Sequence, residues 1–330
     1  MAVDYSKYHS ILDSYEPYQP PAPVDQAAPK QNASALADFG TDLKRGLQQV
    51  PSAVTGLLDI PVAAATGRPM VSEGWEGLGQ ITGFQPQKWS DEARAEYSPE
   101  RQAAQQQAAQ AEGFADTAGV YLSNPSLLAG TVLESVPSIA LGGVYGRALR
   151  GVGALSGVTR GAIGEGSVMA GQSMNEMVDD GVDPRRAAAF ATGVGVAGGA
   201  LGGLGGSLTQ RMGLVDVDTL AAGGARAAGV AAPALLRRVA GGAVAEGAFE
   251  ELPQTLVETS LGNLAADRPW DEDLGKNAAV GLLAGSLMGG VVNIPGARRQ
   301  RDMTQDAPPQ SGEAAPVEQS ALQDAIKTDT

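Results

Sequence analysis

Two long segments without a formal charge constrain the fold of this chain more than any other feature. They span residues 187–208 and 277–297. Each carries glycines at four-residue spacing, which are Gly195, Gly199 and Gly203 in the first segment and Gly281, Gly285 and Gly289 in the second. Residues four apart share one face of an α-helix, so each row forms a flat strip that another helix can approach closely. The sequence therefore predicts helices that pack through glycine faces.

The composition supports the same kind of packing. Aromatic residues make up 5% of the chain, and 45 of its 330 residues are glycine, about twice the usual share. Small side chains bury little apolar area, which stabilises by only about 25 cal/mol per Å². We therefore expect a mostly α-helical protein built from glycine-zipper helical hairpins, either in one bundle or in an oligomer of identical chains.

Four regions follow from the change in composition along the chain. Proline and glutamine dominate residues 1–33, which predicts a disordered arm. Residues 34–116 have the spacing of amphipathic and polar helices, with an irregular connector over residues 69–90. Residues 117–298 are the glycine- and alanine-rich helical region, and residues 299–330 form an acidic tail that we also expect to be disordered.

An internal repeat divides the glycine-rich region. The stretch GAIGEGS at 161–167 matches GAVAEGA at 242–248, and each is followed by an acidic helix, a connector and a glycine-rich segment. Biased composition can produce such a match by chance. The pattern nevertheless predicts two helical-hairpin units, over residues 161–208 and 242–297, within one bundle.

Four glutamates are the candidate structural acidic residues. Glu165 and Glu246 occupy equivalent positions of the repeat, and Glu250 and Glu258 follow Glu246 at four- and twelve-residue spacing. The last three therefore share one helix face. Pro253 is expected to begin or kink a helix there, which would place Glu250 near a positive helix N-terminus.

Metal or proton handling is the alternative role for these acids. Helical-bundle metal sites with carboxylate ligands usually pair glutamate with a histidine on the same helix. The sole histidine, His9, lies in the predicted arm. The sequence therefore predicts neither a metal nor a cofactor.

No catalytic constellation is apparent in the sequence. The dipeptide Glu134-Ser135 is similar to the catalytic glutamate and following serine of lytic transglycosylases, but the rest of that substrate cleft is missing. We interpret Glu134 as a polar contact between helices. A phosphate-binding loop is absent, and with its histidine at position 9 the chain offers no serine triad. The sequence therefore predicts a protein that is not an enzyme.

The uncharged segments leave two environments open. Residues 187–208 are long enough for a bilayer core, which needs about 20 residues. However, alanine and glycine make the segment only weakly hydrophobic, and arginines flank it without a bias in orientation. Conditional insertion into a membrane and a tightly packed soluble assembly both fit. The net charge of −14 argues against direct or sequence-specific nucleic-acid binding, which depends on lysine and arginine.

Residues 242–290 resemble segments of internal virion and DNA-ejection proteins of short-tailed bacteriophages. The resemblance rests on EGAFEE at 246–251, the acidic connector at 267–273 and the glycine row that follows. Residues 161–206 are similar to the same segments, less closely.

The resemblance implies a protein packaged in the virion interior and released with the genome. Together with other virion or ejection proteins it would form a conduit across the host cell envelope. Two other readings stay open, namely a non-viral pore-forming or effector-type protein and a soluble structural scaffold.

Overall fold

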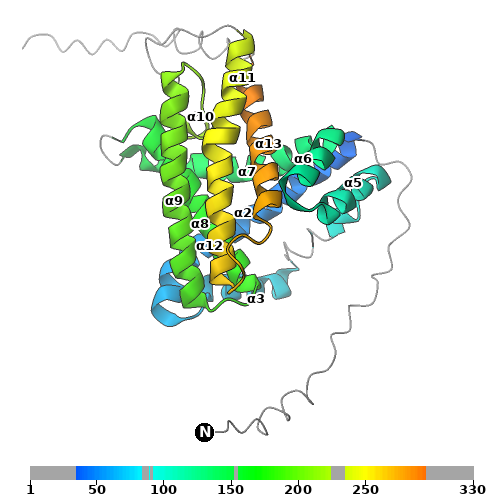
Figure 1. The fold of residues 1–330 in the computed structure, drawn as a ribbon. Helices are drawn as coiled ribbons and strands as arrows, with labels where there is room; N and C mark the ends of the chain where they lie inside the picture. The colour runs from blue at the N-terminus through cyan, green and yellow to red at the C-terminus, as the bar shows by residue number, and fades with distance from the viewer. Residues whose placement is uncertain (1–34, 84–88, 90–91, 152–154, 224–234, 295–330) are drawn as a thin grey trace, which may run out of the picture. The chain divides into compact units, whose positions relative to one another are not determined.

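The chain is described here by a computed structural model covering residues 35–83, 89, 92–151, 155–223 and 235–294. Within these ranges it is built from helices and contains no strand (Figure 1). The predicted mostly α-helical fold is confirmed. The predicted arm at 1–33 and tail at 299–330 lie outside the described residues.

The first half of the described chain holds five helices. They are α2 (Ala35–Thr66), α3 (Met70–Thr82), α5 (Pro99–Gln110), α6 (Gly113–Ser123) and α7 (Pro125–Ala148). Helix α2 covers the stretch whose spacing predicts an amphipathic helix. Helix α3 lies where an irregular connector is expected, so that expectation is wrong. The Asp59 carboxylate of α2 accepts hydrogen bonds from the backbone N–H groups of Val71 and Ser72, and so fixes the start of α3.

The second half contains the glycine-rich helices. They are α8 (Gly157–Asp179), α9 (Pro184–Arg211), α10 (Val217–Ala221), α11 (Leu235–Glu246), the π-helical turn η3 (Gly247–Glu251), α12 (Leu252–Ala265) and α13 (Leu274–Val292), with a 3₁₀ turn η2 (Leu149–Gly151) before α8. Helices α9, α12 and α13 lie side by side, in green, yellow and orange in Figure 1.

Helices α8 and α9 form one antiparallel hairpin. The Asp183 side chain caps α9 by accepting hydrogen bonds from the backbone N–H groups of Arg185 and Arg186, and Pro184 occupies the first helical position. These local signals begin α9 after a connector of four residues that follows the end of α8.

The first glycine row is used inside this hairpin. A Cβ atom built on Gly195 would lie 2.6 Å from the carbonyl oxygen of Gly166, and one on Gly199 would lie 2.7 Å from that of Ala162. Gly203 has slightly more room, with 3.4 Å to Ala162 Cβ. Larger side chains at the first two positions would separate the helices, so this strip is occupied by the chain's own α8.

The second hairpin pairs α13 with the helix that runs through α11, η3 and α12. Cβ atoms built on Gly285 and Gly289 would each lie 2.7 Å from a glutamate Cβ, of Glu251 and Glu246 respectively. Gly281 lies against Thr255 in the same way. Both hairpins are thus closed through glycine within a single chain.

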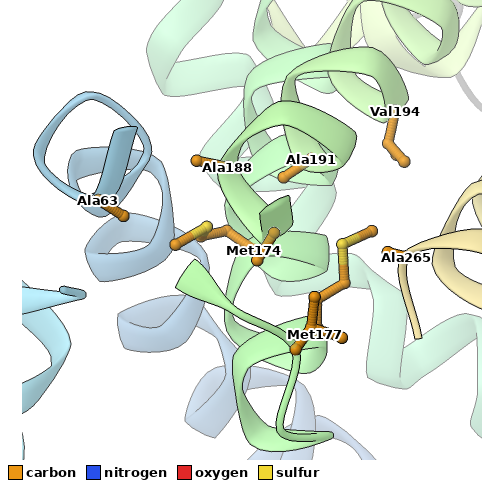
Figure 2. Close-up of a cluster of buried hydrophobic side chains, with 9 residues drawn as sticks. Ala63, Met174, Met177, Ala188, Ala191, Val194 and Ala265 are labelled. Atoms are coloured by element: carbon orange, nitrogen blue, oxygen red, sulfur yellow. The ribbon is translucent and has the colours of Figure 1, made fainter. Parts of the chain in front are cut away.

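The hydrophobic core is made mostly of small side chains. Its buried members are Ala63, Met174, Met177, Val182, Ala187, Ala188, Ala191, Val194 and Ala265. In Figure 2, Met174 extends towards Ala63 of α2 and Met177 towards Ala265 of α12. The two flexible methionines therefore fill the spaces that the alanines leave between helices.

A buried ion pair joins the polar helix α5 to α2. Arg101 Nη2 lies 2.8 Å from Asp42 Oδ1, and the two side chains are 3% and 0% exposed. The Tyr97 hydroxyl donates a second hydrogen bond to the same carboxylate oxygen, at 2.7 Å. Arg101 also donates to the Ser126 carbonyl of α7, so one guanidinium holds three helices together.

The glycine packing can be tested at Gly199. Gly199→Leu should lower the free energy of unfolding by about 1 to 3 kcal/mol, because the added side chain overpacks the α8–α9 contact. Ala200→Leu is the matched control, since Ala200 is exposed on the same helix and should change stability by no more than about 0.5 kcal/mol. Urea unfolding followed by circular dichroism measures both. Equal effects of the two substitutions would contradict the packing described.

The buried ion pair makes a second prediction. Arg101→Met should lower the free energy of unfolding by about 3 to 5 kcal/mol, because Asp42 would remain buried without its cation. Lys44→Met is the control, since the Lys44–Glu96 pair is about half exposed and such pairs contribute about 0 to 1 kcal/mol. A loss as small as that of the control would mean that Arg101 does not compensate Asp42.

Candidate functional site

Five carboxylates meet where the α11–α12 helix passes through its π-helical turn. They are Glu165 of α8, Asp216 and Asp218 at the start of α10, Glu246 at the end of α11, and Glu250 of η3. Oxygens of Glu165, Asp218 and Glu250 lie within 4.8 Å of one another, as do oxygens of Asp216, Glu246 and Glu250. We call the five residues the carboxylate cluster, and Glu250 belongs to both of its groups.

The π-helical turn places Glu250 in this cluster. Leu252 N–H donates to the Gly247 carbonyl, five residues back, and Pro253 follows at the start of α12. Because proline has no N–H group, the wider turn accommodates it without ending the helix. As predicted, a helix begins at Pro253, since α12 starts at Leu252 with the proline in its first turn. Glu250 does not lie at a free helix N-terminus, however, because η3 connects α11 to α12 without a break.

Helix α9 makes room for the carboxylates with a second row of glycines. Cβ atoms built on Gly205 and Gly206 would lie 3.0 Å from Glu250 Cβ and 3.3 Å from Asp216 Cγ. Gly202 lies against the carboxylate of Glu165 in the same way. One face of α9 therefore packs on α8, and the neighbouring face packs on the acids.

Three hydrogen bonds hold one oxygen each of three carboxylates. Gln254 Nε2 donates to Glu165 Oε1 at 2.5 Å. The backbone N–H of Val217 donates to Glu246 Oε1 at 2.9 Å, and that of Thr219 donates to Asp216 Oδ2 at 2.6 Å. These bonds fix the carboxylate orientations.

Apart from neighbouring carboxyl groups, other oxygens of the cluster have no hydrogen-bond partner among the described residues. They are Glu165 Oε2, Asp216 Oδ1, and Oε1 and Oε2 of Glu250, all buried. The ion pairs found among the described residues all lie outside the cluster. Its negative charge is therefore not balanced by a lysine or arginine in the part of the chain that the structure describes.

Burial changes the acidity of these groups. It raises the pKa of Glu165, Asp218, Glu246 and Glu250 well above the ordinary value, and neighbouring carboxylates raise each pKa further. Burial also raises the pKa of Asp216, against the opposing effect of its hydrogen bonds with Thr219 and with the Glu250 carboxyl. The cluster therefore strongly favours a bound positive partner, either protons or a cation.

A cavity of about 250 Å³, lined by polar and apolar side chains alike, adjoins the cluster. Glu165 and Asp218 line it, together with Glu251, Gln254 and Glu258. Burial raises the pKa of Glu251 and of Glu258 to about 7. Glu258 also accepts a hydrogen bond from Ser173 Oγ at 3.2 Å, and the nearby carboxylate of Glu176 raises its pKa further.

The structure brings together three of the four predicted acidic residues. Glu165, Glu246 and Glu250 meet in the cluster, whereas Glu258 lies farther along α12 beside Ser173. Asp216 and Asp218 were missed by sequence reasoning. The Asp-x-x-Thr spacing of Asp216 and Thr219 predicts a helix cap, but nothing in it indicates which acids the cap faces.

Glu134, the residue weighed as a catalytic acid, joins α7 to α2. Its carboxylate lies 3.1 Å from Arg45 Nη1 and accepts a hydrogen bond from Gln49 Nε2 at 2.7 Å. Both partners belong to α2, so the contact is one between helices.

Two helices in the described ranges are long and apolar enough to cross a membrane. They span Pro125–Gly151 and Pro184–Arg211, each with a mean hydropathy of 1.5 in its most apolar stretch. The second contains the first uncharged segment predicted from the sequence. Helix α13, the described part of the other uncharged segment, is not one of the two, whereas α7 was not expected.

Comparison of the chain with protein-family models, curated proteins and solved structures finds no match. The resemblance to phage ejection proteins therefore stays a prediction.

Glu258 makes the stability of the protein depend on pH. The Glu258 carboxyl has a pKa of about 7 in the folded protein and about 4.3 in the unfolded chain. Between these two pH values it keeps its proton in the folded state and has lost it in the unfolded state. Its stabilisation is complete below about pH 4 and is lost as the pH rises to about 7. Urea titrations should therefore show Glu258→Gln more stable than the native chain at about pH 8, by up to about 3 kcal/mol.

Glu73→Gln is the control for this prediction. Glu73 is an exposed carboxylate paired with Arg68, so its substitution should leave the pH dependence of the native chain unchanged. If the stability of Glu258→Gln depends on pH in the same way as that of the native chain, Glu258 is not the group that titrates.

Proposed function

We propose that this protein is an internal virion protein of a short-tailed phage. It would assist genome delivery through the host envelope by assembling its helices with other virion proteins and inserting conditionally into a membrane. The resemblance of residues 242–290 supports the phage assignment. The outward face of α9 supports the membrane step and is the observation on which the proposal depends.

That face is apolar and exposed. Val196 and Leu204 are each 69% exposed, and Ile163 of α8 is 42% exposed beside them. Val196 and Ile163 line an open groove of about 1000 Å³ over α2, α8 and α9, and Leu204 lies outside this groove. Ala200 continues the stripe, and Arg211 is the charged residue at its end. Exposed apolar side chains gathered on one helix are typical of a contact site for a partner or a membrane.

The packing of α9 is suited to its conditional transfer from the bundle into a membrane. About a third of the residues in its most apolar stretch are buried, and those contacts are made largely by glycine, alanine and carboxylates. Each such contact buries little apolar area, so the hydrophobic gain that holds α9 in place is small. In lipid, the same glycine strips would allow close helix association.

The charge of the chain fits a place beside packaged DNA. A net charge of −14 opposes nonspecific binding to phosphates, which depends on cationic side chains. Such a protein could be stored with a genome and leave with it.

A flotation assay tests the membrane step. The native chain should float with liposomes of anionic and neutral lipid, and Val196→Lys combined with Leu204→Lys should abolish flotation. Each lysine near the centre of an inserted helix costs about 2.5 to 3.5 kcal/mol. Leu78→Lys combined with Ile81→Lys is the matched control, because these residues are 56% and 84% exposed but lie on the shorter helix α3.

The outcomes separate the three functions. If the native chain stays unbound, the soluble scaffold is favoured and the membrane step is wrong. If the α9 double variant floats as the native chain does, another surface binds the lipid. Mass spectrometry of purified virions tests the phage assignment, since absence of the chain from virions would favour a pore-forming or effector-type protein.

A further inference from the structure

We propose that the carboxylate cluster binds a divalent metal cation, with Glu250 as the ligand shared by its two groups. The inference is independent of the proposed function, because it concerns five side chains of one chain and holds in a virion, a membrane or solution.

The spacing of the oxygens suits a cation. In each group the oxygens lie within 4.8 Å of one another. Protein oxygens bind Mg²⁺ at about 2.0 to 2.1 Å and Ca²⁺ at about 2.3 to 2.6 Å, so two ligands on opposite sides of an ion are separated by about 4 to 5 Å. Each group can therefore supply three ligands to one ion.

The second observation is the state of Glu250 itself. Glu250 is 1% exposed, it lies within both groups, and neither of its oxygens has a hydrogen-bond partner outside the carboxylate cluster among the described residues. Asp216 is 3% exposed, and its Oδ1 also lacks a partner. Native proteins satisfy buried polar groups, and a buried charge without a partner costs several kcal/mol. These oxygens are therefore positioned to bind a cation.

The hydrogen bonds around the cluster have the arrangement of an outer ligand shell. Gln254 holds one oxygen of Glu165, and the Thr219 backbone holds one oxygen of Asp216. In both carboxylates the other oxygen is the one without a partner. Such bonds orient ligands and keep one oxygen free for the metal.

The donor set selects the class of metal. All five ligands are carboxylates, and the chain contains no cysteine and a single histidine, outside the described residues. Hard oxygen donors favour Ca²⁺, Mg²⁺ and Mn²⁺ over metals that prefer nitrogen or sulfur ligands. The adjoining cavity of about 250 Å³, which Glu165 and Asp218 line, provides space for metal-bound water.

The full-length chain, freed of metal with a chelator, is the material for the test. Addition of Ca²⁺ or Mn²⁺ separately to about 1 mM at neutral pH should raise the unfolding temperature by on the order of 5 °C. Electron paramagnetic resonance should show Mn²⁺ bound at one or two ions per chain. Lowering the pH to about 5 should remove the effect, because protons compete for carboxylate ligands.

Glu250→Gln is the deciding variant, since it keeps the size of the side chain and removes the shared charge. It should fold and should lose both the Mn²⁺ signal and the shift in unfolding temperature. Glu258→Gln is the matched control, because it changes a half-buried carboxyl outside the two groups and should keep both responses. If Glu250→Gln does not fold, Asp216→Asn serves in its place.

Two results would overturn the proposal. One is a native chain that shows neither a shift in unfolding temperature nor bound Mn²⁺ at about 1 mM, which would mean that the cluster holds only protons. The other is a Glu250→Gln protein that binds Mn²⁺ as well as the native chain, which would place the ion elsewhere.

Discussion

Close approach between helix backbones is the contact on which the rest of this structure depends. Helix α8 meets three helices in this way, through Gly164 against Gly142 of α7, Gly171 against Ala53 of α2, and Gly166 against Gly195 of α9. At each point a Cβ atom would collide with a backbone carbonyl of the neighbouring helix. With few large side chains available, this proximity provides dispersion contact that the small residues could not otherwise make.

Other glycines make possible the burial of acids. Gly202 and Gly205 of α9 leave the space that the carboxylates of Glu165 and Glu250 occupy, and Gly289 does so for Glu246. A bundle of ordinary side chains would have pushed these groups to the surface. Because burial penalises the charged form, the packing that holds the helices together also creates a site that requires a proton or a cation.

The exposed face of α9 follows from the same inward packing of small residues. Helix α9 directs its glycines inwards and leaves Val196 and Leu204 exposed. The helix is therefore held by contacts of small area while its larger apolar side chains remain available. This separation of inward glycines from exposed apolar side chains supports the proposed role, because an ejected virion protein would have to exchange its packed state for new contacts.

The sequence alone determined the helical class, the two hairpins and the role of α9 as a long apolar helix, because helical periodicity, capping at Asp183 and segment length are local properties. It did not reveal that α3 is a helix, since the start of α3 is fixed by hydrogen bonds that the backbone of Val71 and Ser72 donates to Asp59. Only the tertiary structure decided that Asp216 and Asp218 join Glu165, Glu246 and Glu250, and that Pro253 is accommodated by a π-helical turn. Glycine spacing along a helix shows which of its faces lacks side chains, because that spacing is a local property. The residues that pack on this face come from distant parts of the chain, so only the tertiary structure identifies them.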